Sequence, residues 1–266
     1  MALSLTLHRW RRQARTLLQR FFLGKVLLQT WQHQQESQRS ICFVAATRAT
    51  EAEFWQQTLL GQRLQEWRHL PQVKHRIAFE NTRGLPAVYN EAIAAADAND
   101  ILVFIHDDAW LLGTQDLAAI RQGLQVYDVV GIAGNTRRFP GQFAWYLRTN
   151  DAQHTVLDMP HLSGAVWYGS VVQKTLNQFG AWPQSCELLD GVLLAARADV
   201  LHRTKLHFDE RFDFHFYDLD FSRTAKSKGI AIGTWPINLL HASQGNLNDP
   251  KWKRNHNIYS GKWENI

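Results

Sequence analysis

Apolar residues along the middle of the chain fall into short, dense runs separated by helix-like and polar segments. The densest run is Ile101–Ile105, five consecutive residues rich in β-formers, which indicates a strand buried on both faces. Further strands are predicted at Ile41–Ala46, Val73–Phe79, Val129–Ala133, Leu188–Ala196 and Ile230–Ile237. Helices are predicted at Glu51–Leu60, Leu85–Ala98, Asp116–Val126 and Asp213–Lys228. This alternation predicts an α/β fold, with a doubly wound, mostly parallel sheet flanked by helices.

The first 36 residues follow a different pattern, that of an amphipathic helix. Apolar residues recur every three or four positions, the spacing of one helical face; they are Leu3, Leu7, Trp10, Ala14, Leu17, Phe21, Leu28 and Trp31. Residues 1–40 also hold seven Lys and Arg against one Glu, so this segment accounts for the whole net charge of +5. We therefore predict a basic, helical arm over residues 1–36.

Two roles for this arm remain open. A basic amphipathic helix is typical of a protein that lies on an anionic membrane surface, which residues 1–31 would contact. The same apolar face could instead pack on the protein's own core, or on a second subunit in a homodimer. Charged residues interrupt the apolar positions too often for a spanning helix, and no signal-peptide cleavage site follows.

The remainder of the chain has the composition of an ordinary globular protein, with 45% apolar and 20% charged residues overall. Beyond the arm it is nearly neutral, which argues against a nucleic-acid partner. Two cysteines, Cys42 and Cys186, imply no disulfide framework and favour a cytoplasmic location, with peripheral attachment to the inner membrane face as the hypothesis that the arm adds. Residues 246–266 are predicted to form a polar C-terminal tail.

The end of the strand at 101–105 carries the most informative polar cluster. His106, Asp107 and Asp108 follow it directly, at the edge where open α/β sheets bind their ligands. Two adjacent carboxylates beside a dry strand repel each other, and a divalent cation would relieve that repulsion. The alternative is that Asp107 or Asp108 merely caps the following helix. We favour the cation.

Six other short motifs occur in order along the chain. They are Asn81-Thr82-Arg83-Gly84-Leu85, Tyr89-Asn90-Glu91-Ala92, Leu189-Asp190-Gly191-Val192, Phe208-Asp209-Glu210, Phe216-Tyr217-Asp218-Leu219-Asp220-Phe221 and His241-Ala242-Ser243. Together with the His-Asp-Asp cluster they resemble the family 2-like glycosyltransferases of the GT-A fold, particularly the bacterial branch with a histidine in its DxD-type motif. The resemblance covers residues 40–245 and implies a GT-A-like domain there, while the N-terminal arm has no counterpart.

The resemblance implies a site for Mn²⁺ or Mg²⁺ at the DxD position. Asp108 falls on the carboxylate that holds the cation against the sugar-nucleotide diphosphate. His241 matches a C-terminal histidine that completes the metal shell in many members, although a structural role for it remains open. His106 stands where the first Asp is usual, and we expect His106 and Asp107 to contact the donor.

The resemblance also implies the catalytic carboxylates. Asp218 falls on the aspartate of the family's Glu-Asp motif, the general base of inverting transferases, and Tyr217 replaces the Glu. Asp190 resembles the position beside the acceptor and the donor sugar. Plain helix-terminal and turn roles for these two acids remain open. The nucleotide is expected to contact the carboxyl ends of the first two strands, through Thr47, Arg48, Glu80, Asn81 and Arg83.

Taken together, these residues predict a metal-dependent, inverting glycosyltransferase. Its partners would be a nucleotide-sugar donor, expected to be UDP-linked, and a hydroxyl acceptor such as a membrane-associated glycan or glycolipid precursor. One rival is a nucleotidyltransferase, although the segment after the first strand, Thr47-Arg48-Ala49-Thr50, has none of the glycines of a phosphate-binding loop. The other is a non-catalytic nucleotide-sugar or glycan-binding protein, suggested by the departures at His106 and Tyr217.

Overall fold

The computed structural model describes residues 39–149, 154–243 and 250–263. The arm predicted over residues 1–36 lies outside these ranges. In the described ranges, no helix combines the length and the apolar character that crossing a membrane requires.

A central sheet of seven strands carries the core, and the α/β class predicted from the sequence is confirmed. Its strands, in spatial order, are β11 (Gln184–Ser185), β14 (Ile232–Thr234), β5 (Val129–Gly131), β13 (Leu193–Arg197), β3 (Asp100–Ile105), β1 (Ser40–Ala46) and β2 (Val73–Ala78). Every residue of β3 is buried, as its continuous apolar run predicts. The middle of this sheet is therefore buried on both of its faces.

This sheet is mixed in direction. β1 runs parallel to β2 and β3, and β14 runs parallel to β5. β13 lies between β3 and β5 and is antiparallel to both. The single run predicted at Leu188–Ala196 is in fact two strands, β12 (Leu188–Leu189) and β13, because the chain turns at Gly191 and Val192, directly after Asp190. That turn belongs to the site described below.

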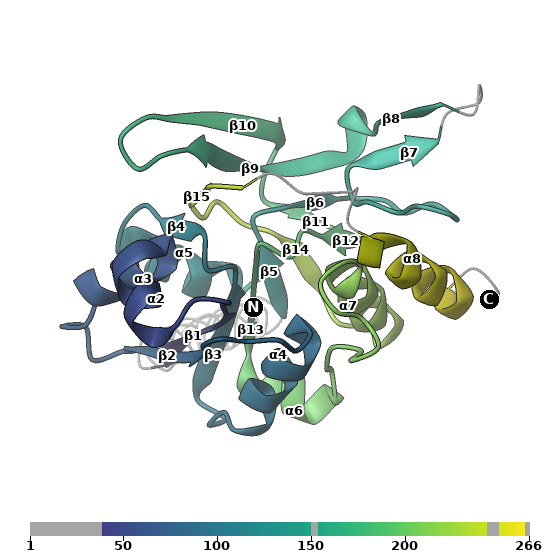
Figure 1. Cartoon of the computed structure of the whole chain (residues 1–266). Coiled ribbons are helices and arrows are strands. Elements are labelled where there is room, and N and C mark those ends of the chain that lie inside the picture. Colours follow the sequence, from purple (N-terminus) through teal and green to yellow (C-terminus); the bar gives the residue numbers. More distant parts are fainter. Residues whose placement is uncertain (1–38, 150–153, 244–249, 264–266) are drawn as a thin grey trace, which may run out of the picture. The chain divides into compact units, whose positions relative to one another are not determined.

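A second sheet lies beside the carboxyl end of β3 (Figure 1). Its strands, in spatial order, are β12, β6 (Ala133–Asn135), β9 (Leu162–Gly169), β15 (Leu239–His241) and β4 (Ala109–Leu111), and β10 (Lys174–Gly180) pairs with β9. A separate ribbon consists of β7 (Leu147–Thr149) and β8 (Thr155–Leu157), followed by the short 3-10 helix η1 (Met159–His161). Because β4 follows β3 after only three residues, the two sheets meet at His106–Asp108.

Helices flank the sheets, and those at 51–57, 85–94, 115–123 and 217–227 match predicted helices with changed boundaries. The helix at 59–66 lies mostly beyond a predicted one, and those at 198–204 and 250–263 were not predicted. In chain order, the helices are α2 (Glu51–Gln57), α3 (Leu59–Glu66), α4 (Leu85–Ala94), α5 (Gln115–Gly123), α6 (Ala198–Thr204), α7 (Tyr217–Ser227) and α8 (Pro250–Trp263). The helix predicted at Glu51–Leu60 breaks at Thr58, whose hydroxyl donates to Phe54 O and accepts from Gly61 N–H. Thr58 thus ends one helix and caps the next.

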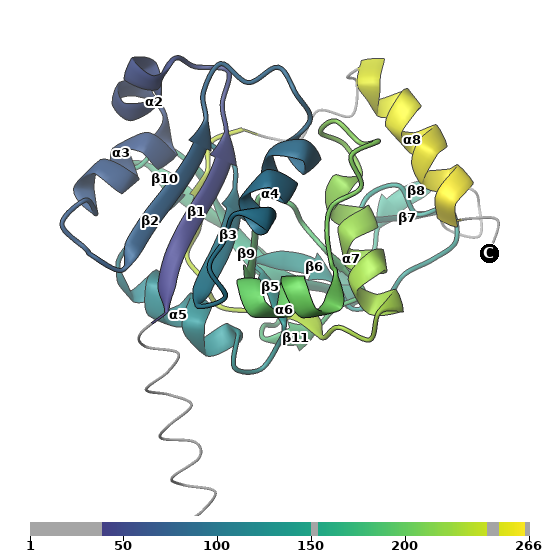
Figure 2. The same ribbon diagram turned by 90° about the horizontal axis from the view of Figure 1, so that it is seen from below.

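The segment predicted as a polar tail contains α8, which lies beside α7 in both views (Figures 1 and 2). Tyr259 is 2% exposed, and its ring packs on Phe216 at a centroid distance of 5.2 Å. Lys262 bridges Asp209 and the buried Asp220. This helix was not predicted, because α8 has no broad apolar face and is held in place by one buried ring and by ion pairs.

Candidate functional site

The pairing of β15 with β4 brings together two segments that are far apart in sequence. In this antiparallel register His241 lies opposite Ala109, one residue after Asp108. The backbone N–H of Ala242 donates to Asp108 O, and that of Ser243 donates to Asp108 Oδ2 (3.2 Å). The end of β15 therefore closes over the His106–Asp108 turn, as the sequence-based assignment of His241 requires.

His106, Asp108 and His241 form a group that could hold a metal ion. Each offers one ligand atom, and these atoms all lie within 4.8 Å of one another. His241 Nε2 is 3.2 Å from Asp108 Oδ1. Ligands about 2.1 Å from a common ion lie at most about 4.2 Å apart, so shifts of a few tenths of an ångström would close the set. The donor atoms and their partial exposure fit a divalent cation.

The electrostatics of this group favour negative charge on Asp108. Burial by itself would raise the pKa of Asp108, but contacts with His241 and with the side chain of Ser243 outweigh it and lower that pKa. His241 is affected in the opposite sense, because its bond to Asp108 overcomes burial and raises the imidazole pKa. Burial and the nearby His241 lower the pKa of His106. A neutral His106 beside a charged Asp108 suits metal binding.

Tyr217 fixes the ring of His106. The Tyr217 hydroxyl donates to Gly191 O (2.7 Å), and its oxygen lies 3.1 Å from His106 Nε2. Because the single phenolic proton is used on Gly191, the hydrogen-bond pattern assigns the Nε2 proton to His106 as the donor. His106 Nδ1 then keeps its lone pair. Tyr217 therefore links the ring of His106 to the backbone of Gly191.

Asp218 lies in the first turn of α7, next to Tyr217. Its two oxygens accept from the backbone N–H groups of Gly191 (3.0 Å) and Leu219 (2.9 Å). Burial and the negative charge of Asp190 nevertheless raise the pKa of Asp218 to about 7. A carboxyl group with this pKa can take up and release a proton near neutral pH, which is what a general base needs.

Local backbone geometry brings α7 this close to the β12–β13 turn. Phe216 precedes the helix with φ +67°, a left-handed conformation that is uncommon for a bulky residue. Rings of α8, among them Tyr259 and Trp252, pack on Phe216 and hold it there. A Cβ at Gly191 would lie 2.3 Å from the Tyr217 hydroxyl oxygen, so only glycine permits this approach.

Asp190 completes the carboxylate pair. Its Oδ1 accepts from Val192 N–H (2.8 Å), and its Oδ2 accepts from the indole N–H of Trp145 (2.6 Å). The negative charge of Asp190 acts on Asp218, His106 and His241, so the carboxylate pair and the three-residue group share one site. Sequence reasoning missed Trp145, since it lies in a segment with neither strand nor helix periodicity.

The residues predicted to contact the nucleotide gather at the carboxyl ends of β1 and β2. Asn81 N–H donates to Thr47 O, and Glu80 N–H donates to Ala49 O, so the two loops are joined. Thr47 is buried and Arg48 is exposed. Arg83 forms an ion pair with Glu91, and Asn81 binds the Arg83 backbone. Asp107 contributes its carbonyl to Leu60 N–H. The nucleotide-binding roles of these residues stay predictions.

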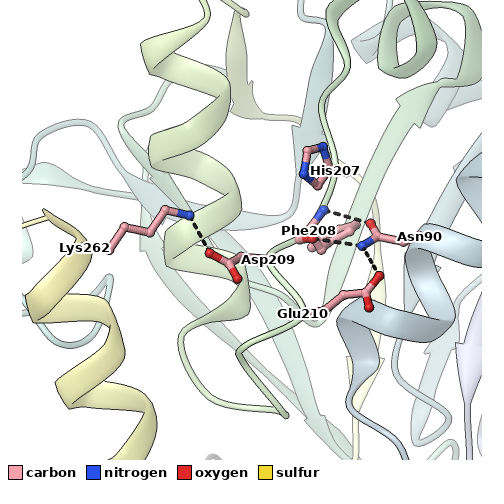
Figure 3. Close-up of a pocket in the computed structure, with 6 residues that line it drawn as sticks. All are labelled: Asn90, His207, Phe208, Asp209, Glu210 and Lys262. Atoms are coloured by element: carbon pink, nitrogen blue, oxygen red, sulfur yellow. Dashed lines mark hydrogen bonds and ion pairs between the residues drawn. The ribbon is translucent and has the colours of Figure 1, made fainter.

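A hollow of about 360 Å³ lies elsewhere, between α4, the segment before α7 and the end of α8 (Figure 3). It is lined by Asn90, His207, Phe208, Asp209, Glu210 and Lys262. Asn90 donates to Phe208 O and to Glu210 Oε1, and Lys262 donates to Asp209 Oδ2 (Figure 3). These bonds satisfy the polar groups within the wall itself. The hollow shares no residue with the site above.

Comparison with solved structures gives weak overall similarity. A mannosyltransferase from Pyrobaculum calidifontis, in complex with GDP-Man and Mn²⁺, is 15% identical over 84% of this chain and 66% of its own, with a TM-score of 0.43. GalNAc-T7 with UDP, GalNAc and Mn²⁺ is 11% identical over 85% and 56%, with a TM-score of 0.44. S. aureus TarS 1-349 is 12% identical over 76% and 60%, with a TM-score of 0.41. The chain thus spans less than two thirds of each.

Sequence comparison is more decisive. No curated protein matches the chain. The family described as "Glycosyltransferase like family" matches residues 73–263, which include His106, Asp108, Asp218 and His241 and make up well over half of the sequence. The chain belongs to this glycosyltransferase-like family.

Proposed function

We propose that the enzyme transfers a sugar from a nucleotide-diphosphate donor to a hydroxyl acceptor, with a divalent cation and with inversion at the sugar carbon. The observation that carries this proposal is the hydrogen-bonded link from the candidate metal group to the carboxylate pair. His106 contacts Tyr217, Tyr217 contacts Gly191, and Gly191 contacts Asp218. Leaving-group assistance and proton removal would thus be held in one rigid unit.

The metal side of the proposal assigns the ligands to His106, Asp108 and His241. A cation bound there would neutralise the charge that grows on the departing nucleoside diphosphate. Two imidazoles and one carboxylate suit Mn²⁺ better than Mg²⁺, since Mg²⁺ strongly prefers oxygen ligands. His106 is kept neutral by burial and oriented by Tyr217, while Asp108 supplies the negative charge.

The carboxylate side assigns the general base to Asp218. Inversion requires a base on the face of the sugar opposite the leaving group, where it removes the acceptor proton as the hydroxyl oxygen attacks. Asp218, with a pKa of about 7, is suited to this exchange, and burial together with the charge of Asp190 keeps that pKa raised. Thr47, Arg48, Glu80, Asn81, Arg83 and Asp107 are proposed to bind the nucleotide.

A product assay tests the function. The protein would be incubated with Mn²⁺ and each of a panel of donors: UDP-glucose, UDP-galactose, UDP-N-acetylglucosamine and GDP-mannose. We expect one of them to raise the melting temperature in the presence of Mn²⁺ and to release nucleoside diphosphate. Release of pyrophosphate from a nucleoside triphosphate plus a sugar phosphate would favour the nucleotidyltransferase. Binding of a donor without any turnover would favour the binding protein.

The acceptor is proposed to be a glycan or glycolipid precursor at the membrane. This proposal rests on the basic amphipathic pattern of residues 1–31. We expect the full chain to sediment with vesicles that contain anionic lipid, and a chain that lacks residues 1–36 to remain in the supernatant. Equal sedimentation of the two would contradict it, and dimerisation that is lost with the arm would favour a subunit contact instead.

A further inference from the structure

A series of buried polar side chains connects the protein surface to Asp190. Arg137 pairs with Asp158, which is fully buried and also accepts from Asn135 Nδ2 (3.0 Å). Asn135 Nδ2 in turn donates to Trp145 O (2.9 Å). The indole N–H of Trp145 then reaches Asp190 Oδ2 at 2.6 Å. The series joins four parts of the chain, at Asn135 and Arg137, at Trp145, at Asp158 and at Asp190.

The position of the Trp145 indole is determined from several sides. Gln142 Nε2 donates to Trp145 O (3.2 Å) and to Leu147 O, so the loop is closed around the residue. The ring meets Phe179 edge-on at a centroid distance of 5.0 Å and Tyr146 at 5.3 Å. With 6% of its surface exposed, the side chain has little freedom to turn. The indole is a rigid donor aimed at one carboxylate oxygen.

The same bond determines the orientation of Asp190. Its other oxygen is held by Val192 N–H, so the carboxylate is fixed at both ends and stays beside Asp218. Buried polar groups such as Asn135 and Asp158 add little net stability even when they are paired. A buried network that ends on a site carboxylate is better explained by the geometry it imposes than by stability.

We propose that Trp145 is a positioning residue for glycosyl transfer, and that it acts through Asp190. Its N–H locks the carboxylate beside the base, and the Asn135–Asp158 pair locks Trp145. This inference rests on the proposed function. Trp145 touches no reacting atom, so its removal should lower the turnover number and leave donor binding intact, because the nucleotide-binding and metal-binding residues are elsewhere in the site.

The experiment compares two Trp→Phe substitutions. Trp145→Phe removes the N–H and keeps an aromatic ring for Phe179 and Tyr146. Trp263→Phe is the matched control, since the Trp263 indole also donates to a buried aspartate, Asp220, at 2.7 Å on the side of α7 that faces α8. Both variants lose one charge-assisted hydrogen bond. We expect Trp145→Phe to lower kcat about 10-fold with an unchanged donor KM, and Trp263→Phe to alter kcat less than twofold.

A double-mutant cycle separates positioning from general damage. In an Asp190→Asn background the carboxylate that Trp145 positions is already gone, so Trp145→Phe should have less than a twofold further effect. Equal 10-fold losses in both backgrounds, or a wild-type kcat in Trp145→Phe, would overturn this inference alone. A wild-type protein that releases no nucleoside diphosphate from any donor of the panel would overturn the proposed function and the inference together.

Discussion

Asp108 and Asp218 are two aspartates in one site, and their surroundings act on them in opposite directions. Burial would raise the pKa of Asp108, but the bond to His241 and the side chain of Ser243 lower it, so Asp108 stays charged. Burial and the charge of Asp190 raise the pKa of Asp218 to about 7, even though two backbone N–H groups bind it. In the proposed function, this difference assigns the cation to one carboxylate and the exchange of a proton to the other, since each task needs a different pKa.

The largest expected effect is the loss of turnover on substitution of Asp218. Asp218→Asn keeps the size of the side chain and removes the base, so turnover should fall about 10²- to 10⁴-fold. Binding of UDP with Mn²⁺, measured by calorimetry, should stay within a factor of about two. Initial rates of nucleoside diphosphate release measure the change. Full-rate release by this variant would reject Asp218 as the base.

Asp108→Asn should weaken binding of the metal ion, which Asp218→Asn leaves unchanged. It removes the negative charge that both histidines face, so Mn²⁺ affinity should fall on the order of 100-fold, the upper end of the cost of losing an outer partner of a metal ligand. Titration of free Mn²⁺, followed by electron paramagnetic resonance, measures this without turnover. Asp218→Asn is the control and should bind Mn²⁺ as the wild type does. If both variants bind equally, the cation is held elsewhere.

The apolar pattern of the sequence predicted a functional position for Asp108 more directly than for Asp218. β3 is buried on both faces, so it appears as an unbroken apolar run, and the polar residues after Ile105 stand out. Asp108 could be singled out for that reason. The environment of Asp218 depends instead on the antiparallel insertion of β13 and on the close approach at Gly191. Neither leaves a periodic signal, and a raised pKa could not be predicted from residue type.

Other parts of the site were hidden for related reasons. Trp145 lies in an irregular segment, and its partner Asp190 is reached only through the fold. α8 is polar along most of its length, so its anchor Tyr259 gave no amphipathic stripe. The resemblance between motifs compensated for part of this, because it placed His241 with Asp108 before the register of β15 and β4 was known.

Tyr217→Phe tests the hydrogen-bonded connection between the candidate metal group and Asp218. The phenyl ring fills the same space but leaves His106 Nε2 without its oxygen partner and Gly191 O without its donor. Loss of such an outer hydrogen bond should lower Mn²⁺ affinity about 10-fold. Tyr89→Phe is the matched control, since Tyr89 is equally buried and packs on Tyr217 at 5.9 Å. Unchanged Mn²⁺ affinity in Tyr217→Phe would show that the tyrosine does not prepare the imidazole.

The last expected effect is on the melting temperature, and its direction follows from the raised pKa of Asp218. The pKa of Asp218 rises to about 7 in the folded protein from an ordinary value of 3.8, so the unfolded chain loses this proton first as the pH increases. The wild-type native state therefore loses stability as the pH rises from about 4 to about 7, because of the Asp218 carboxyl group, which the Asp218→Asn variant lacks. Relative to wild type, the melting temperature of Asp218→Asn should rise with increasing pH across that interval, by about 2–4 °C for each kcal/mol of stability that the wild type loses, and then level off.

Asp209→Asn is the control for this last effect, because hydrogen bonds from Arg211 and Lys262 lower the pKa of Asp209. The stability that Asp209 contributes is present above its ordinary pKa and is lost only as the pH falls below about 4. The melting temperature of Asp209→Asn, relative to wild type, should thus be constant from pH 5 to pH 8. Differential scanning calorimetry at four pH values measures both differences. A constant difference for Asp218→Asn over the same range would mean that Asp218 is already charged at pH 5, and its assignment as a base that titrates near neutrality would fail.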